Sequence, residues 1–186
     1  MPGRHDVGGR CVHVIAPSNR CLEMLGEAAA AWQQIPVAIE RGMTAMIDRL
    51  LGTWTLVSAV REEIPSGART DMFGQDPHGF INYSPDGHMI ALITRGDRKA
   101  PADGRPTPAE AEALFRSMLS YAGTYTVEDD VVTHHVDISW NQSFTGGTQK
   151  RAFKLEGDRL ILSTPQSHDP IDGKMSVRRM TWRRVG

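Results

Sequence analysis

The sequence is poor in cysteine and contains no long apolar run. Its 186 residues include two cysteines, Cys11 and Cys21, whose spacing fits neither a disulfide framework nor a zinc motif. No run of 18 apolar residues is present, so no membrane-spanning helix is expected. The first residues also lack the apolar core of a signal peptide, and we therefore expect a cytoplasmic protein.

An excess of charge of either sign is lacking as well. The formal net charge is −1, which argues against a nucleic-acid or membrane partner, because such partners usually need a basic surface. The densest basic group alternates with apolar residues near the C-terminus, which indicates a solvated strand face: Arg178, Arg179, Arg183 and Arg184. The sequence carries no signal for an oligomeric state.

Motifs for metal binding and for common catalytic chemistry are missing. His134 and His135 are adjacent on a predicted strand, so they point to opposite faces and cannot share a metal ion. The spacings H-x-H and H-E-x-x-H, the Gly-x-Ser-x-Gly elbow and the phosphate-binding glycine patterns are absent. We expect neither a metal nor a cofactor.

Residues 1–42 differ from the rest of the chain. The first twenty mix Gly, His, Arg and Pro without periodicity, which favours disorder, and apolar residues then recur at helical spacing from Leu22 to Ile35. Two interpretations remain open. The segment is either an extension with a short helix, or the product of a mis-assigned start, since Met43 opens a natural beginning for a domain over 43–186.

From Thr53 the hydrophobic period is two, as in strands with one buried face. A helix interrupts the strands: Thr107 and Glu110 form a capping box around Pro108, and an apolar stripe follows to Leu119. The pattern predicts an all-β, eight-stranded antiparallel barrel with one helix that closes or flanks it. The expected strands are 53–62, 79–84, 88–95, 121–128, 131–140, 147–156, 159–164 and 175–184.

Short turns fix several registers. The turn at Asp129-Asp130 places Tyr125 opposite His134, and the turn at Gly157-Asp158 places Phe153 opposite Leu162. If the loop over 141–146 closes a simple hairpin, His134 lies near the level of Phe153, with Arg151 one diagonal step away.

Four short motifs lie in or beside the expected strands and occur in one order along the chain. They are Gly52-Thr53-Trp54, Tyr83-Ser84-Pro85-Asp86-Gly87, Thr133-His134-His135-Val136 and Gly147-Thr148-Gln149-Lys150-Arg151. From about Leu50 onward the chain resembles the small lipocalin-like domain proteins. The resemblance implies a calycin-type barrel with a small-molecule lumen and no agreed reaction. It also implies that the Trp54 indole packs under an arginine of the closing strand, either Arg183 or Arg184.

The candidate site follows from strand alternation. In residues 131–140 the apolar set from Val132 to Trp140 faces the lumen and includes His134, and two lysines mark the outer face of residues 147–156, so Gln149 and Arg151 point inward. Tyr125 approaches from the neighbouring strand. Tyr83 joins this group if Pro85-Asp86-Gly87 forms a three-residue loop. A few polar groups in an apolar wall are typical of a ligand pocket.

Three functions fit this pattern. The first is binding of a small, largely apolar molecule in the lumen. The alternative is a cofactor-independent isomerase, cyclase or dehydratase with His134 as its acid/base, assisted by Arg151 and Tyr125. The third is a protein-interaction module with a filled core and no lumen. Whichever function holds, His134 and Arg151 could instead be structural residues that only support the fold.

Overall fold

The computed structural model describes residues 46–169 and 172–186, so the predicted extension over 1–42 lies outside the described residues. A short helix over 46–50 leads into the strands, and two further helical elements follow, α3 (Pro108–Arg116) and the 3-10 turn η1 (Gln142–Phe144). The strands are β1 (Gly52–Glu63), β2 (Arg69–Asp71), β3 (His78–Tyr83), β4 (His88–Thr94), β5 (Met118–Glu128), β6 (Val131–Ser139), β7 (Thr148–Glu156), β8 (Arg159–Ser163), β9 (Ser167–His168) and β10 (Met175–Arg184).

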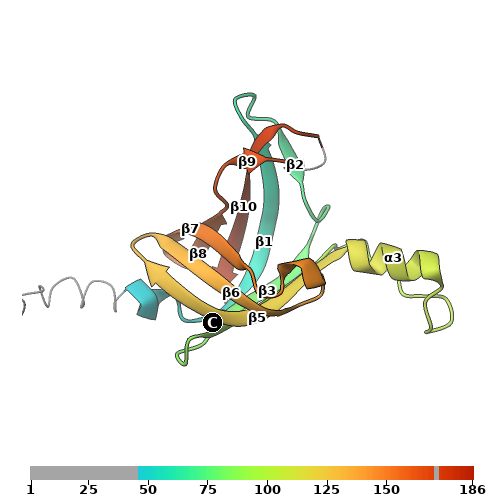
Figure 1. Cartoon of the computed structure of the whole chain (residues 1–186), viewed down its shortest axis with the longest axis horizontal. Coiled ribbons are helices and arrows are strands. Elements are labelled where there is room, and N and C mark those ends of the chain that lie inside the picture. The colour runs from blue at the N-terminus through green and yellow to red at the C-terminus, as the bar shows by residue number, and fades with distance from the viewer. Residues whose placement is uncertain (1–45, 170–171) are drawn as a thin grey trace, which may run out of the picture. The chain divides into compact units, whose positions relative to one another are not determined.

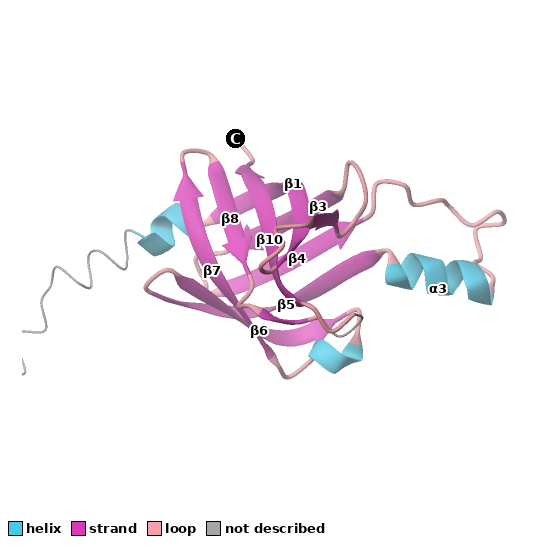
Figure 2. Cartoon of the chain, turned by 90° about the horizontal axis from the view of Figure 1, so that it is seen from above, coloured by secondary structure: helices cyan, strands magenta, loops and turns pink. Residues whose placement is uncertain are grey.

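Eight of these strands close into an antiparallel barrel, which confirms the predicted fold (Figures 1 and 2). The order around the barrel is β1-β3-β4-β5-β6-β7-β8-β10, and β10 pairs back onto β1. The short strands β2 and β9 extend β1 and β10 at one end. Closure leaves no free sheet edge along these eight strands and encloses one interior face.

The registers counted from the two short turns are confirmed: Tyr125 pairs with His134, and Phe153 pairs with Leu162. The register between β6 and β7 is different from the prediction. His134 lies opposite Gln149 and not near Phe153, because η1 lengthens the connection and Val136 already exchanges hydrogen bonds with Gly146 and Gly147. Arg151 still lies one diagonal step from His134, since it pairs with Val132.

A β-bulge overturns the prediction that Ile138 faces the lumen. The ladder between β5 and β6 steps from Gly123–Val136 to Ala122–Ile138, so Asp137 is an extra residue that reverses the alternation. Ile138 is consequently 67% exposed. Trp140, also predicted to face the lumen, packs edge-on against Phe144 in the connection after β6.

The predicted capping box and the Pro at the start of α3 are present. None of the nine residues of α3 is buried, and the helix projects from one side of the barrel in both views, so it does not close the barrel (Figures 1 and 2). The helix ends at Arg116. Met118 and Leu119 were expected on its apolar stripe, but they pair with Thr94 and Ile93 as the first residues of β5.

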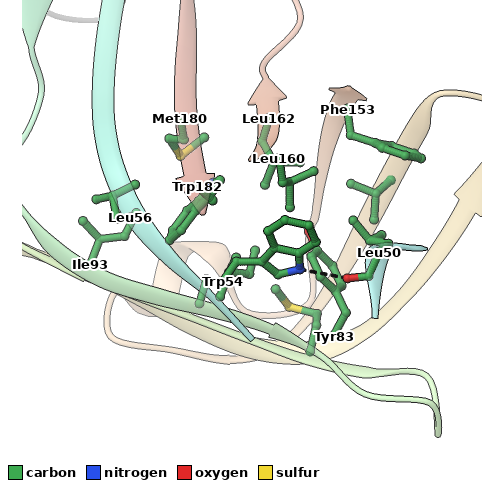
Figure 3. Packing of buried hydrophobic residues seen from close by; sticks show 14 of the residues in the cluster. Leu50, Trp54, Leu56, Tyr83, Ile93, Phe153, Leu160, Leu162, Met180 and Trp182 are labelled. Atoms are coloured by element: carbon green, nitrogen blue, oxygen red, sulfur yellow. Dashed lines mark hydrogen bonds between the residues drawn. The ribbon is translucent and has the colours of Figure 1, made fainter. Parts of the chain in front are cut away.

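One end of the barrel is filled by large side chains around Trp54 (Figure 3). The Trp54 indole N–H donates to the Leu50 carbonyl at 2.9 Å. The Arg184 guanidinium carbon lies 4.0 Å from the ring centre and the same group donates to the carbonyls of Arg49 and Leu51. Of the two arginines left open by the sequence, Arg184 makes this contact. We call this end, where β1 begins, the closed end.

Candidate functional site

His134 lies inside the barrel between two tyrosines. Its side chain is 0% exposed, and its Nε2 and Nδ1 atoms each lie 2.8 Å from a phenolic oxygen, that of Tyr83 and that of Tyr121 respectively. Tyr83 reaches the imidazole because the turn after β3 is a three-residue loop, in which Gly87 has a φ of 84° and the Ser84 N–H donates to the His88 carbonyl. The condition for an inward Tyr83 is therefore met.

This Tyr83–His134–Tyr121 group is uncharged at neutral pH. Burial lowers the pKa of His134 to about 3, and the positive charge of Arg151 contributes in the same direction. Burial also raises the pKa of the Tyr83 and Tyr121 hydroxyls above the ordinary value. A neutral imidazole has one donor and one acceptor nitrogen, and a phenol can serve either. Both nitrogens of His134 are thus satisfied inside the protein.

Tyr125 extends this group toward the closed end without contacting His134 through its hydroxyl. Its ring packs edge-on against Tyr83 at 5.0 Å between ring centres. Its hydroxyl donates to the Ser84 carbonyl at 3.1 Å. Tyr125 is therefore fixed to the β3–β4 turn, and its hydroxyl is already bonded to the main chain.

The opposite end of the barrel is open and forms a cleft of about 650 Å³. Its lining comes from the first residues of β5 and β7, from η1, β9 and the middle of β10, and from the loops that follow β2 and β8. We call it the mouth cleft. Five of its lining residues are large and apolar: Met72, Phe73, Leu119, Phe144 and Met180. Its volume lies within the range of small-molecule sites, roughly 300–1,000 Å³.

Gln149 and Arg151 project from β7 into the mouth cleft. The Arg151 guanidinium donates to the Gln149 side-chain carbonyl at 3.1 Å and to the Lys150 main-chain carbonyl at 2.7 Å. Within residues 46–169 and 172–186, no carboxylate forms an ion pair with Arg151. The described lining of the cleft includes Lys150 and Arg178 and contains neither Asp nor Glu.

The five predicted site residues thus separate into two groups. Gln149 and Arg151 line the mouth cleft, whereas Tyr83, Tyr125 and His134 lie outside its lining, with His134 directly across the sheet from Gln149. Tyr121 was missed, although its spacing of four from Tyr125 on one strand places both on the same face. Met72, Phe73 and Phe144 come from connections whose positions strand alternation does not specify.

Two further features of the described residues bear on function. No cluster of three or more His, Cys, Asp or Glu side chains is placed to hold a metal ion in this part of the chain. Among the helices that the structure describes, none has the length and apolar character needed to cross a bilayer.

A match to a family profile agrees with this architecture. A family profile described as a lipocalin-like domain matches residues 51–185. A lipocalin-like protein from Bacteroides uniformis is 14% identical and superposes with a TM-score of 0.39, over 74% of this chain and 99% of its own. An uncharacterized protein from Bacteroides eggerthii is also 14% identical, with a TM-score of 0.36 over 73% of this chain and 99% of its own. Among curated proteins, no sequence matches this chain significantly.

Proposed function

The chain belongs to the lipocalin-like domain family, and from that premise we propose that its barrel binds one small, largely apolar molecule that carries an acidic group. The ligand occupies the mouth cleft, with its acidic group on Arg151 and its apolar body against Met72, Phe73 and Met180. One observation carries the proposal: Arg151 faces an apolar cleft and has no carboxylate partner among the described residues.

The energetics of a partly buried charge support an acidic ligand. A guanidinium in an apolar environment is costly unless an opposite charge or several hydrogen bonds compensate it. Gln149 and the Lys150 carbonyl satisfy two of the five donors of Arg151 and leave others for a ligand. A carboxylate fits because its two oxygens match the planar donors of arginine.

The charges around the mouth cleft favour the same class of ligand. Lys150 and Arg178 lie in its lining with Arg151, and the described lining holds no acidic residue to offset them. Arg178 is engaged by Asp169 at 2.8 Å and Lys150 belongs to the outer side of β7, so Arg151 supplies the positive charge that faces the cleft. A cationic ligand would be repelled, and a neutral one would leave Arg151 without a counter-charge.

The arrangement of His134 favours binding over catalysis. A general acid or base must reach a reacting atom, and both nitrogens of His134 are held by the hydroxyls of Tyr83 and Tyr121. The open mouth cleft likewise favours a binding protein over an interaction module with a filled core. A cytoplasmic location stays a prediction from the sequence.

The test is calorimetric titration with three probes that share a ten-carbon chain: decanoate, 1-decanol and decyltrimethylammonium. We expect decanoate to bind tightest, because only it supplies a counter-charge for Arg151. Replacing Arg151→Met should weaken decanoate binding roughly tenfold to a hundredfold, which corresponds to loss of a charged hydrogen bond of about 1.5–3 kcal/mol.

Lys154→Met is the matched control, because Lys154 points outward from the same strand and pairs with Glu156. It removes the same charge without touching the mouth cleft and should leave decanoate binding unchanged. Equal affinity for decanoate and 1-decanol, or unchanged decanoate binding in Arg151→Met, would refute the proposal.

A further inference from the structure

The segment 95–117, which we call the arm, joins β4 to β5 and projects from the barrel (Figures 1 and 2). Its helix α3 has no buried residue, and Phe115 near the end of this helix is 47% exposed. A nine-residue helix gains little stability from its caps alone and normally depends on packing of its apolar side. The contacts at the base of the arm therefore determine where the helix lies.

One of these contacts is a chain of aromatic rings that runs from α3 to the mouth cleft. The Trp140 indole N–H donates to the Phe115 carbonyl at 3.2 Å, and the two rings lie 6.0 Å apart. The same indole packs edge-on against Phe144 of η1, at 5.2 Å between ring centres. Phe144 in turn lines the mouth cleft. Three rings from three segments thus connect the arm with the wall of the cleft.

The second contact joins the arm to the loop after β2, which carries Phe73 of the cleft lining. The two main chains pass so close that a Cβ at Gly96 would lie 2.2 Å from the Asp76 carbonyl oxygen. A Cβ at Gly74 would lie 3.0 Å from a guanidinium nitrogen of Arg95. The first residues of the arm are therefore packed directly against the loop that carries part of the cleft wall.

The end of the arm continues into the cleft wall. The Arg95 N–H donates to the Ser117 carbonyl at 2.9 Å and closes the base of the arm. Leu119 follows two residues later on β5 and lines the mouth cleft. Three of the five large apolar residues of the cleft thus belong to segments that meet the arm at its base: Phe73, Leu119 and Phe144.

Among these links, the aromatic chain depends on a side chain that lies outside the buried core, that of Trp140. The main chain of η1 is held by its own bonds, since Asn141 accepts from the Ser143 N–H and the Gly147 N–H donates to the Phe144 carbonyl. The orientation of the Phe144 ring then depends on its packing against the core and against Trp140. Edge-on aromatic pairs have a preferred geometry, so Trp140 restricts this ring.

We propose that the arm orients the apolar wall of the mouth cleft, with Trp140 as the positioning residue that transmits the placement of α3 to Phe144. The inference rests on the proposed function, because Phe144 contacts a ligand only where the ligand occupies the mouth cleft. Ordering a loose side chain on binding costs affinity, so a Phe144 ring already held by Trp140 raises it. Whatever displaces α3 loosens Phe144 and weakens ligand binding, which makes the arm a regulatory element of the cleft.

The first measurement is calorimetric titration with decanoate. Trp140→Ala and Phe115→Ala should each weaken binding roughly threefold to tenfold, the effect expected for loss of one aromatic pair. Neither residue lies in the lining of the mouth cleft, so neither change removes a ligand contact. Trp140→Phe keeps a ring beside Phe144 and should restore most of the affinity.

Leu114→Ala is the matched control, because it removes an apolar side chain from the same helix but not from the aromatic chain. It should leave decanoate binding unchanged. Urea unfolding should remain a single cooperative transition in every variant, which separates a local change at the cleft from a general loss of structure.

The second measurement needs no ligand and is fluorine NMR of protein labelled with 4-fluorophenylalanine. The Phe144 resonance is the one that disappears in Phe144→Leu. It should shift in Phe115→Ala, because Trp140 links the two rings, and it should stay in place in Leu114→Ala.

A Phe144 resonance that Phe115→Ala leaves in place would overturn the inference. Decanoate affinity that is unchanged in both Trp140→Ala and Phe115→Ala would overturn it as well. A wild-type protein that does not bind decanoate, but whose Phe144 resonance shifts in Phe115→Ala, would refute the proposed function and support the positioning of Phe144 by the arm.

Discussion

The polar groups inside the barrel have different kinds of partner at its two ends. At the closed end and just above it, three groups have partners inside the protein: His134 has two tyrosine hydroxyls, the Trp54 N–H has the Leu50 carbonyl, and Arg184 has two main-chain carbonyls. The buried Trp182 N–H is the exception there, since it has no hydrogen-bond partner among the described residues. At the open end, Arg151 has hydrogen bonds but no described counter-charge.

The partners of a polar residue distinguish a structural role from a ligand-binding role better than its residue type does. A histidine and an arginine on inward faces of neighbouring strands look alike in the sequence, and either could serve a ligand. A polar group whose partners are all internal stabilises the fold, and its loss leaves those partners unsatisfied. A charge that lacks an opposite charge and faces a cleft has interactions left for a ligand.

The largest loss of stability should come from a substitution at the closed end. Trp54→Ala removes a fully buried indole, its hydrogen bond to Leu50 and its contact with Arg184, and we expect a loss of roughly 3–5 kcal/mol in the free energy of unfolding by urea. Trp140→Ala, outside the barrel interior, is the control and should cost much less. Equal losses would remove the distinction between a packed closed end and the rest of the barrel.

Replacing the buried histidine should cost nearly as much. His134→Leu leaves the hydroxyls of Tyr83 and Tyr121 buried without a partner, so we expect a loss of roughly 2–5 kcal/mol in urea unfolding. Adding Tyr83→Phe and Tyr121→Phe to this variant should recover part of the loss. A His134→Leu protein as stable as the wild type would show that the imidazole is not structural.

The pH dependence of the free energy of unfolding tests the buried, neutral state of His134. The folded pKa of His134 is about 3 against an ordinary value of 6.5, so below pH 6.5 the unfolded chain takes up a proton that the folded chain does not. Stability from this group is complete above pH 6.5 and is lost as the pH falls toward 3, with about 2 kcal/mol lost by pH 5.

His134→Gln is the control for this prediction, because an amide offers both tyrosines a donor and an acceptor but does not titrate. Between pH 7 and 5, urea unfolding of this variant should depend less on pH than that of the wild type. Identical slopes in the two proteins would mean that His134 takes up a proton in the folded state.

The smallest effect on stability should come from Arg151. Arg151→Met should change the melting temperature little or raise it slightly, because it removes a charge from an apolar cleft. Arg184→Met, the same substitution at the closed end, should lose about 1–2 kcal/mol with its contact to Trp54. If Arg151→Met is the more destabilising of the two, Arg151 is a structural residue.

Much of the barrel could be predicted from the sequence because its turns are short. Two-residue turns at Asp129 and Gly157 fix their registers by counting, and the loop at Pro85 determines where Tyr83 points. The bulge at Asp137 could not be predicted, because the alternation of apolar and polar residues from Val132 to Trp140 predicts an unbroken strand. The cause lies on another strand, where Gly123 admits the close backbone approach.

The candidate site was less predictable, since roles depend on contacts between distant segments. Sequence alternation placed Gln149 and Arg151 inward, yet it could not show that Tyr121 would complete the hydrogen bonding of His134. The apolar lining of the mouth cleft comes largely from loops, such as the one with Met72 and Phe73, whose position is set by packing at the barrel end. Which polar residue is satisfied internally is decided only in three dimensions.

The most direct test of the difference between the two ends is a crystal structure of the protein with decanoate. We expect the carboxylate within hydrogen-bonding distance of the Arg151 guanidinium, the alkyl chain along Met72, Phe73 and Met180, and the Tyr83–His134–Tyr121 group unchanged. Decanoate bound away from Arg151, or inserted between His134 and its tyrosines, would contradict the assignment of the open end to binding and the closed end to structure.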